Sequence, residues 1–83
     1  MNAEMKFPVV AHHRVIINAA SRDDATVQAL FNSFDLVEPI AIGNTSSGGK
    51  YLSYGISVRF ESPDTMARFD SVLKQIPGLK MVL

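Results

Sequence analysis

The clearest pattern in the chain is a strict alternation of apolar residues with small or polar residues over Tyr51–Glu61. Successive side chains of a strand point to opposite faces, so this segment predicts a strand with one face in the core. The predicted core face consists of Leu52, Tyr54, Ile56, Val58 and Phe60. We expect the rest of the chain to cover that face and to leave the other face free.

Two further segments repeat apolar residues with the period of a helix. The first is predicted to begin with Ser21 as N-cap and to end near residues 34–36, with a stripe made of Val27, Leu30, Phe31 and Phe34. The second is predicted to begin with Ser62 as N-cap and Pro63 in the first turn, with a stripe made of Met66, Phe69, Leu73 and Ile76. Pro77 and Gly78 are expected to end it.

Three shorter strands are predicted at residues 13–20, 38–45 and 79–83. In the second of these, Ile40 and Ile42 should share a face. Pro39 cannot donate a backbone hydrogen bond, which predicts that this strand lies at a sheet edge. Residues 44–50, NTSSGGK, have the composition of a hairpin loop that leads into Tyr51.

The resulting order, β-α-β-β-α-β, predicts an α+β fold, a single ferredoxin-like sandwich over residues 8–83. It has a four-stranded antiparallel sheet in the order 4-1-3-2 and two helices on one face. Residues 1–7 have no periodic pattern and are expected to form a loose N-terminal lead-in. A chain of 83 residues is near the lower limit for one core, so self-association through the free edge of the last strand would add stability.

Composition narrows the possible classes of function. Eight basic and eight acidic residues cancel, so the chain lacks the overall positive field of most nucleic-acid-binding proteins. There is no cysteine, which excludes disulfides and thiolate chemistry. No tract approaches the about 18 apolar residues of a membrane span, and the first residues do not have the pattern of a secretory signal. We expect a cytoplasmic domain with no membrane partner.

The chain resembles the YbeD-like family of small bacterial proteins of unassigned function. The similar pieces are Phe7-Pro8, Ser46-Ser47 with Gly49 and Tyr51, the alternating strand, and the terminal Met81-Val82-Leu83. The resemblance implies a ferredoxin-like fold similar in shape to ACT regulatory domains, which bind small effectors. It therefore implies a regulatory or binding role, and it identifies no catalytic residues.

Catalysis and metal binding have little support in the sequence, so we expect no enzyme activity, cofactor or metal. His12 and His13 are adjacent, and neighbouring strand residues face opposite ways, which disfavours a shared metal. The GNTSSGGK segment at residues 43–50 has the wrong spacing for a phosphate-binding loop and is followed by a strand. Acylphosphatases share the predicted topology, but their glycine-rich arginine loop is absent here.

One candidate ligand site lies at the start of the first predicted helix, where free backbone N–H groups can hold a carboxylate or phosphate. Its candidate ligand-binding residues are Asn18, Ser21 and Arg22. The competing interpretation is a helix capped by its own acidic residues, Asp23 and Asp24.

The free face of the sheet is the candidate interaction face, because its small residues allow close approach of a partner. Its predicted members are Arg14, Ile16, Ser53, Gly55, Ser57, Arg59, Lys80 and Val82. An ordinary solvated sheet face is the competing interpretation. Arg14, Arg59 and Lys80 could also cluster there to bind RNA, although the face lacks a platform of stacking aromatic residues.

We therefore predict a non-catalytic regulatory or adaptor module that binds either another protein or a second copy of itself as a homodimer. The alternative is an ACT-like sensor of a small anionic metabolite such as an amino acid. Nucleic-acid binding is the third hypothesis.

Overall fold

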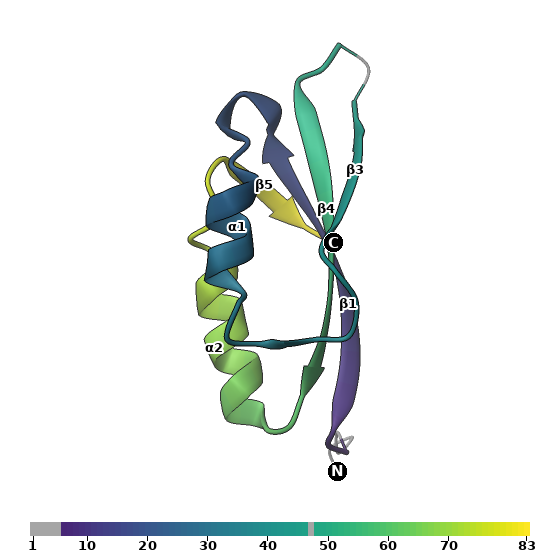
Figure 1. Ribbon diagram of the computed structural model, residues 1–83, viewed down its shortest axis with the longest axis vertical. Coiled ribbons are helices and arrows are strands. Elements are labelled where there is room, and N and C mark those ends of the chain that lie inside the picture. Colours follow the sequence, from purple (N-terminus) through teal and green to yellow (C-terminus); the bar gives the residue numbers. More distant parts are fainter. Residues whose placement is uncertain (1–5, 47) are drawn as a thin grey trace.

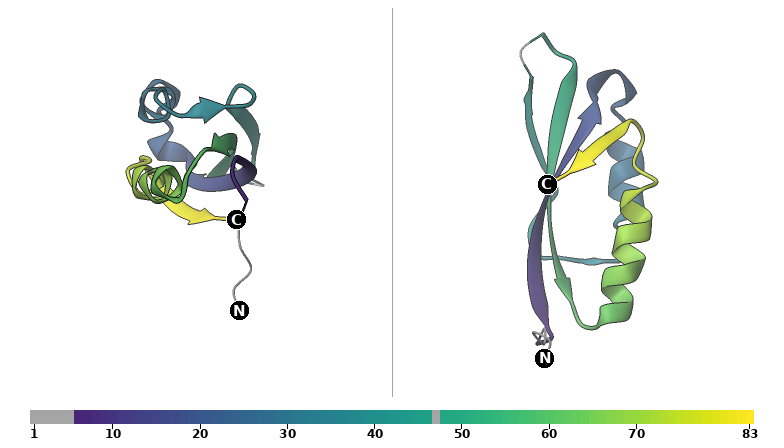
Figure 2. Two further views of the ribbon diagram at one scale, coloured as in Figure 1. Left: turned by 90° about the horizontal axis from the view of Figure 1, so that it is seen from below. Right: turned by 180° about the vertical axis from the view of Figure 1, so that it is seen from behind.

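The computed structural model describes residues 6–46 and 48–83. It has two layers, an antiparallel sheet and a pair of helices that cover one face of it (Figures 1 and 2). The elements are β1 (Val9–Asn18), the 3-10 turn η1 (Ala19–Ser21), α1 (Asp24–Leu30), β2 (Asp35–Leu36), β3 (Ala41–Thr45), β4 (Tyr51–Phe60), α2 (Pro63–Leu73) and β5 (Leu79–Val82). The strand order is β2-β4-β1-β5, with β3 also paired to β4. This is the predicted ferredoxin-like α+β arrangement, with five strands instead of four.

The strand β4 occupies the centre of the sheet and confirms the strongest prediction from the sequence. Its alternating apolar residues Leu52, Tyr54, Ile56, Val58 and Phe60 are at most 2% exposed. They face the helices and contact Phe31, Phe34 and Phe69 in one continuous core. The alternation in the sequence therefore encodes the boundary between the two layers.

The strand β1 is longer than predicted and begins at Val9 rather than at residue 13. It pairs antiparallel with β4 along its whole length, from Val9 opposite Phe60 to Asn18 opposite Tyr51. Because β4 offers ten residues for pairing, β1 begins directly after Pro8. The predicted lead-in falls mainly on residues 1–5, which lie outside the described residues.

The first helix is shorter than predicted at both ends. Asp23, and not Ser21, is its N-cap, and the helix ends at Leu30. Ser21 belongs to η1, in which the Ala20 N–H donates to the side chain of Asn18. Two strong cap residues, Asn18 and Asp23, therefore divide the predicted first turn into a separate 3-10 turn and a later helix start. Phe31 and Phe34 reach the core from the irregular turn that follows α1.

The segment between α1 and β4 contains an additional strand. The short strand β2 pairs with the Arg59 end of β4, whereas β3 pairs nearer the Tyr54 end. The chain leaves the sheet between these two pairings, so Glu38 and Pro39 lie outside β3 and the predicted start at residue 38 was wrong. The edge position was right, because β3 pairs with β4 alone. Ile42, predicted to share a face with Ile40, is 48% exposed.

The second helix confirms its predicted start. The hydroxyl of Ser62 accepts a hydrogen bond from the Thr65 N–H, and Pro63 occupies the first turn. Gly78 follows the helix with a positive φ of 71°, and a Cβ atom there would lie 2.6 Å from the Cβ of Ser21. Only glycine fits this close approach between the α2–β5 turn and η1. In the described residues no helix has the length and apolar character that crossing a membrane requires.

A register shift in the last strand changes the orientation of its side chains. Ile16 lies opposite Met81, but Ile17 lies opposite Leu79, so one residue of β5 is extra at this point. Such a bulge reverses the alternation beyond it. Val82 pairs with the buried Val15 and faces the helices, whereas Met81 lies beside Ile16. The predicted position of Val82 on the uncovered face was wrong for this reason.

Candidate functional site

The open face is the side of the sheet that the helices leave uncovered (Figure 2). Cross-strand partners share a face, and the β1–β4 register therefore brings most of the predicted interaction residues together. Arg14 lies opposite Gly55, Ile16 opposite Ser53, and His12 opposite Ser57. The open face is thus a real surface shared by β1 and β4.

The centre of the open face is flat because its residues are small. A Cβ atom on Gly55 would contact only the Cβ of Ala41, at 3.5 Å. A Cβ atom on Gly43 would collide with the hydroxyl of Ser53. The edge strand β3 therefore lies close against β4 without large side chains between them. Another surface can approach the backbone here.

A relay of three polar side chains crosses the open face. Nδ1 of His12 lies 2.7 Å from Oγ of Ser57, and that hydroxyl donates to Oε2 of Glu38 at 2.9 Å. A hydroxyl has one proton, so Ser57 accepts from His12 while it donates to the carboxylate. Nδ1 of His12 therefore holds a proton. The sequence did not indicate this relay, because Glu38 is 19 residues and His12 is 45 residues from Ser57.

The cations of the open face fall into two groups. Arg59 is neutralised locally, with Nε 3.1 Å from Oε2 of Glu61 and 4.0 Å from Oδ2 of Asp35. It lies beside Val10, at the opposite end of β4 from Tyr51. The predicted cluster of Arg14, Arg59 and Lys80 therefore does not form. Arg14, Lys50 and Lys80 make no ion pair with any acidic side chain of residues 6–46 and 48–83.

The unpaired cations surround adjacent shallow hollows next to Tyr51. One hollow of about 260 Å³ is lined by Asn18, Lys50, Tyr51 and Lys80. A second, of about 380 Å³, is lined by Ile16, Tyr51, Lys80 and Met81. A third, of about 260 Å³, includes Arg14, Ile16, Tyr51 and Ser53. Tyr51 and Met81 are 40% and 53% exposed, so this end of the face combines positive charge with apolar surface.

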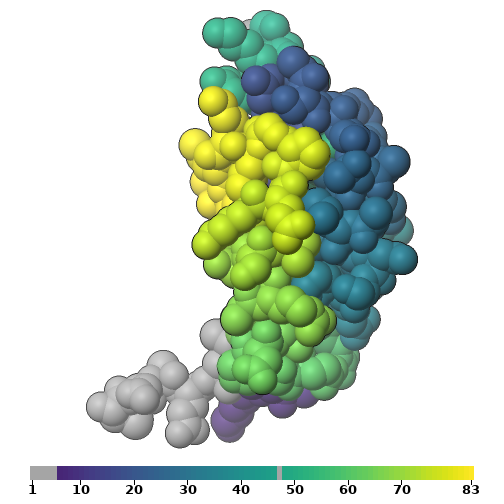
Figure 3. All heavy atoms as spheres, turned by 90° about the vertical axis from the view of Figure 1, so that its left-hand side faces the viewer, coloured from purple at the N-terminus to yellow at the C-terminus, as the bar shows by residue number. Residues whose placement is uncertain are grey.

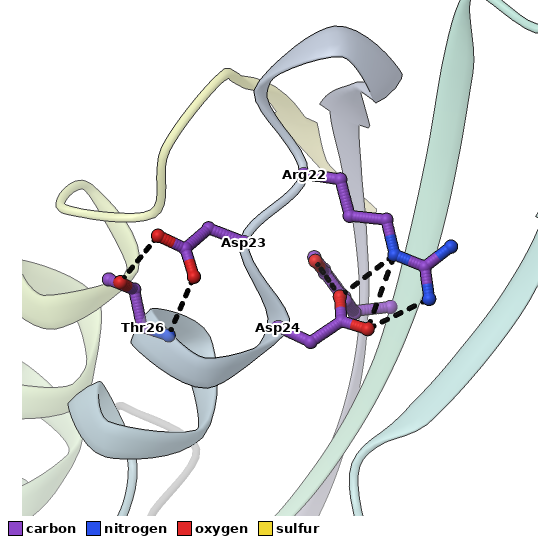
Figure 4. A network of polar contacts seen from close by, with 5 residues as sticks. Arg22, Asp23, Asp24 and Thr26 are labelled. Atoms are coloured by element: carbon purple, nitrogen blue, oxygen red, sulfur yellow. Dashed lines mark hydrogen bonds and ion pairs between the residues drawn. The ribbon is translucent and has the colours of Figure 1, made fainter.

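The predicted ligand site at the start of the first helix uses its polar groups internally (Figure 4). The side chain of Asn18 accepts from the Ala20 N–H at 3.0 Å, and Nη2 of Arg22 donates to Asp24 at 2.8 Å. Asp23 accepts from both the N–H and the hydroxyl of Thr26. The hydrogen bonds from Arg22 and Tyr54 lower the pKa of Asp24. The arrangement favours the competing interpretation of a self-capped helix.

The carboxylate of Asp24 also connects the core to the turn at the start of α1. Tyr54, 1% exposed, donates its hydroxyl to Oδ1 of Asp24 at 2.8 Å. Burial, together with this hydrogen bond, raises the pKa of Tyr54 to about 12. The phenol therefore stays protonated and keeps donating.

Neither of the other chemical patterns in the sequence forms a site in the part of the chain that the structure describes. No three His, Asp or Glu side chains there come together as a metal site requires. The glycine-rich segment is a closed hairpin turn, in which the Ser46 N–H donates to the Tyr51 carbonyl at 2.8 Å. It leads into β4 and not into a helix.

The family described as "Protein of unknown function (DUF493)" matches residues 2–83, so the chain belongs to that family. This is the YbeD-like family of the sequence resemblance. No curated protein matches the sequence.

Two solved structures are similar in fold. One is a solution structure of protein HP0495 from Helicobacter pylori, with a TM-score of 0.72 and 15% identity over 99% of this chain and 88% of that chain. Another solution structure of the hypothetical protein HP0495 has a TM-score of 0.58 and 18% identity over 99% and 96% of the two chains. At these identities the similarity shows the fold alone.

Proposed function

We propose that this member of the DUF493 family is a non-catalytic adaptor or regulatory module whose open face binds an acidic surface of another protein. The observation that supports this most strongly is the set of unpaired cations, Arg14, Lys50 and Lys80, beside exposed Tyr51 and Met81. Aromatic residues, methionine and arginine are enriched where proteins bind one another. The chain as a whole has no net charge, so these cations form a local excess of positive charge at this end of the face.

Charge also decides between a different protein and a second copy of the chain. If two open faces met, the interface would contain the unpaired cations Arg14, Lys50 and Lys80 of both copies. Like charges brought together cost free energy, whereas an acidic partner gains attraction and faster association. The open face therefore fits a different protein better than itself.

The geometry of the relay supports a binding role over a catalytic one. In a nucleophilic triad the histidine lies between the hydroxyl and the carboxylate and removes the hydroxyl proton. Here Ser57 lies in the middle, and its proton is directed to Glu38. Ser57 is also only 5% exposed. The relay holds the β2–β3 connection against the sheet, which keeps the open face in shape.

Paired affinity capture from extract of the native cell, followed by mass spectrometry, tests the proposal. The wild type is compared with Arg14→Glu/Lys80→Glu on the open face and with Lys74→Glu on α2 as a charge-matched control. We expect a protein that binds the wild type and the control but not the double variant. Its affinity, measured with purified components, should fall at least about tenfold in the double variant and should decrease with added salt.

Other outcomes would contradict the proposal. If every captured protein binds all three forms equally, the open face is an ordinary solvated surface. If the captured material is removed by ribonuclease, the third hypothesis, nucleic-acid binding, replaces protein binding. If the wild type sediments as a dimer that the double variant disrupts, the partner is a second copy.

A further inference from the structure

The covered side of the sheet contains a cavity of about 390 Å³ between α2 and the β5 edge. Figure 3 shows this side of the molecule, with α1 and α2 next to each other and β5 at the border of α2. Most of the wall is apolar and comes from Phe60, Met66, Phe69, Leu73, Leu79 and Val82. The remaining lining residues are His13, Asp70 and Lys74.

The space borders the end of the described pairing between β1 and β5. β5 pairs with β1 from Ile17 to Val15, and Leu83 adds hydrogen bonds to Arg14. In the described part of the chain, β1 has no neighbour on that side beyond Arg14. His13 is the next residue of β1 on the helix-covered face. There α2 passes over β1 at a point where β1 is not paired with β5. The bulge in β5 turns Val82 into the same space.

His13 is a polar residue in an apolar wall. Its ring centroid lies 4.7 Å from that of Phe69 and 6.3 Å from that of Phe60. Its Nδ1 is buried and makes no well-formed hydrogen bond among the described residues, although the Ile56 backbone lies near enough to oppose the lowering of the ring's pKa by burial. Buried polar atoms are nearly always satisfied in folded proteins, and an exception indicates a missing partner or a functional role. An aliphatic or phenyl side chain would complete this wall without leaving a polar atom unpaired.

The rim of the cavity has one group of each charge. Asp70 and Lys74 are one helical turn apart on α2, with Oδ2 and Nζ separated by 3.7 Å. Their side chains are 69% and 75% exposed, and an exposed pair of this kind is held weakly. Lys74 is therefore available to a ligand that enters the cavity. A pocket with apolar walls and a few polar groups is the usual form of a small-molecule site.

We propose that this cavity binds a small carboxylic acid with an apolar or aromatic body. The body lies against the accessible apolar side chains Met66, Leu79 and Val82, the carboxylate contacts Lys74, and His13 provides a polar contact within the wall. Two sources share this chemistry, namely a simple monocarboxylate and an apolar amino acid, whose ammonium group Asp70 would accept. The proposal does not rest on binding through the open face, which lies on the other side of the sheet.

The test is an NMR titration of the full chain with three matched probes: 3-phenylpropionate, phenylalanine and 3-phenylpropanamide. We expect the two acids to shift the resonances of His13, Met66 and Phe69. The neutral amide should bind about tenfold more weakly or worse, because it lacks the charge that Lys74 recognises. Tighter binding of phenylalanine assigns an amino acid, and tighter binding of 3-phenylpropionate assigns a simple monocarboxylate.

Variants locate the site. Lys74→Ala should weaken the acids by about tenfold, and Val82→Phe should block them by adding bulk to the wall. Lys80→Ala, a lysine of the open face, should leave their affinity unchanged. Asp70→Asn should weaken the binding of phenylalanine alone.

The proposal is overturned if the cavity resonances do not shift at millimolar acid, if the amide binds as well as the acids, or if Lys74→Ala binds the acids like the wild type. Any of these results leaves the open-face proposal intact, because that proposal expects replacement of Lys74 to leave binding of the partner protein unchanged.

Discussion

The two faces of β4 belong to one strand but are determined by different parts of the chain. On the covered face, five large apolar side chains are packed by both helices, and any apolar neighbour of suitable shape satisfies them. On the open face, Ser57 depends on two specific polar atoms, one from β1 and one from the β2–β3 connection. A hydrophobic core tolerates variation in its partners, whereas a polar relay requires particular atoms at particular distances.

The adjacent histidines of β1 show the same contrast at one step along the chain. His12 is exposed on the open face and donates to Ser57. His13, half-buried on the covered face, contacts two phenylalanine rings and has an unpaired Nδ1. Identical side chains thus acquire different chemistry from alternation alone. The polar ring on the apolar face is the exception, and it lines the cavity that we propose binds a carboxylic acid.

The largest difference between the two faces should appear in the free energy of unfolding when two neighbouring residues of β4 are replaced. Ile56→Ala removes a fully buried side chain, and we expect it to lower the free energy of unfolding by about 2–5 kcal/mol. Gly55→Ala adds a methyl group at ordinary contact distance from Ala41 and should change stability by less than about 1 kcal/mol. Urea unfolding followed by circular dichroism measures both. Similar losses in the two variants would contradict the division of the strand into a core face and an open face.

The polar relay should contribute less than the core. Ser57→Ala leaves Glu38 and His12 without their shared partner, and we expect a loss of about 1 kcal/mol in the free energy of unfolding. Ser53→Ala is the matched control on the same face, since the Ser53 hydroxyl makes no hydrogen bond with the described side chains. The same urea experiment compares them. If Ser53→Ala costs as much as Ser57→Ala, the relay has no stabilising role.

The sequence predicted those features that depend on neighbouring residues. Alternation over residues 51–60 identified the central strand, and Ser62 with Pro63 identified the start of α2, because both signals are local. The start of α1 was misplaced because Asn18, Ser21 and Asp23 are all competent caps, and the choice between them depends on how η1 packs against Gly78.

Features that depend on register could not be predicted. The face of Val82 depends on a bulge that exists only when β5 is paired with β1. The relay joins residues from β1, β4 and the connection between β2 and β3, and no spacing in the sequence relates them. The cavity brings His13 of β1 together with residues of α2 and β5, and no spacing in the sequence relates them. The fold and most of the open face were therefore predictable, whereas the relay and the cavity became visible only in the structure.

The smallest expected effect is a dependence of stability on pH that comes from His13. Burial is the main cause that lowers the pKa of His13 below 6.5, and the charge of His12 adds to it, while the Ile56 backbone and Asp70 oppose it. Lys74 lines the same cavity. Below about pH 6.5 the unfolded chain gains a proton on His13 that the folded chain does not, so stability should fall as the pH decreases toward 5. Above that pH the folded and unfolded states hold the same number of protons at this residue, and the contribution is constant.

His13→Phe should remove this acid-dependent loss of stability, because phenylalanine keeps a ring against Phe69 and takes up no proton. His12→Gln leaves His13 in place and should retain the loss. Urea unfolding of the three proteins at about pH 7 and pH 5 measures the difference between them. If His13→Phe loses as much stability on acidification as the wild type, the His13 ring is accessible to protons in the folded state. Water would then reach the covered face at the cavity more easily than the packing of Phe60 and Phe69 indicates. The two faces would not differ in solvent access near the β5 edge.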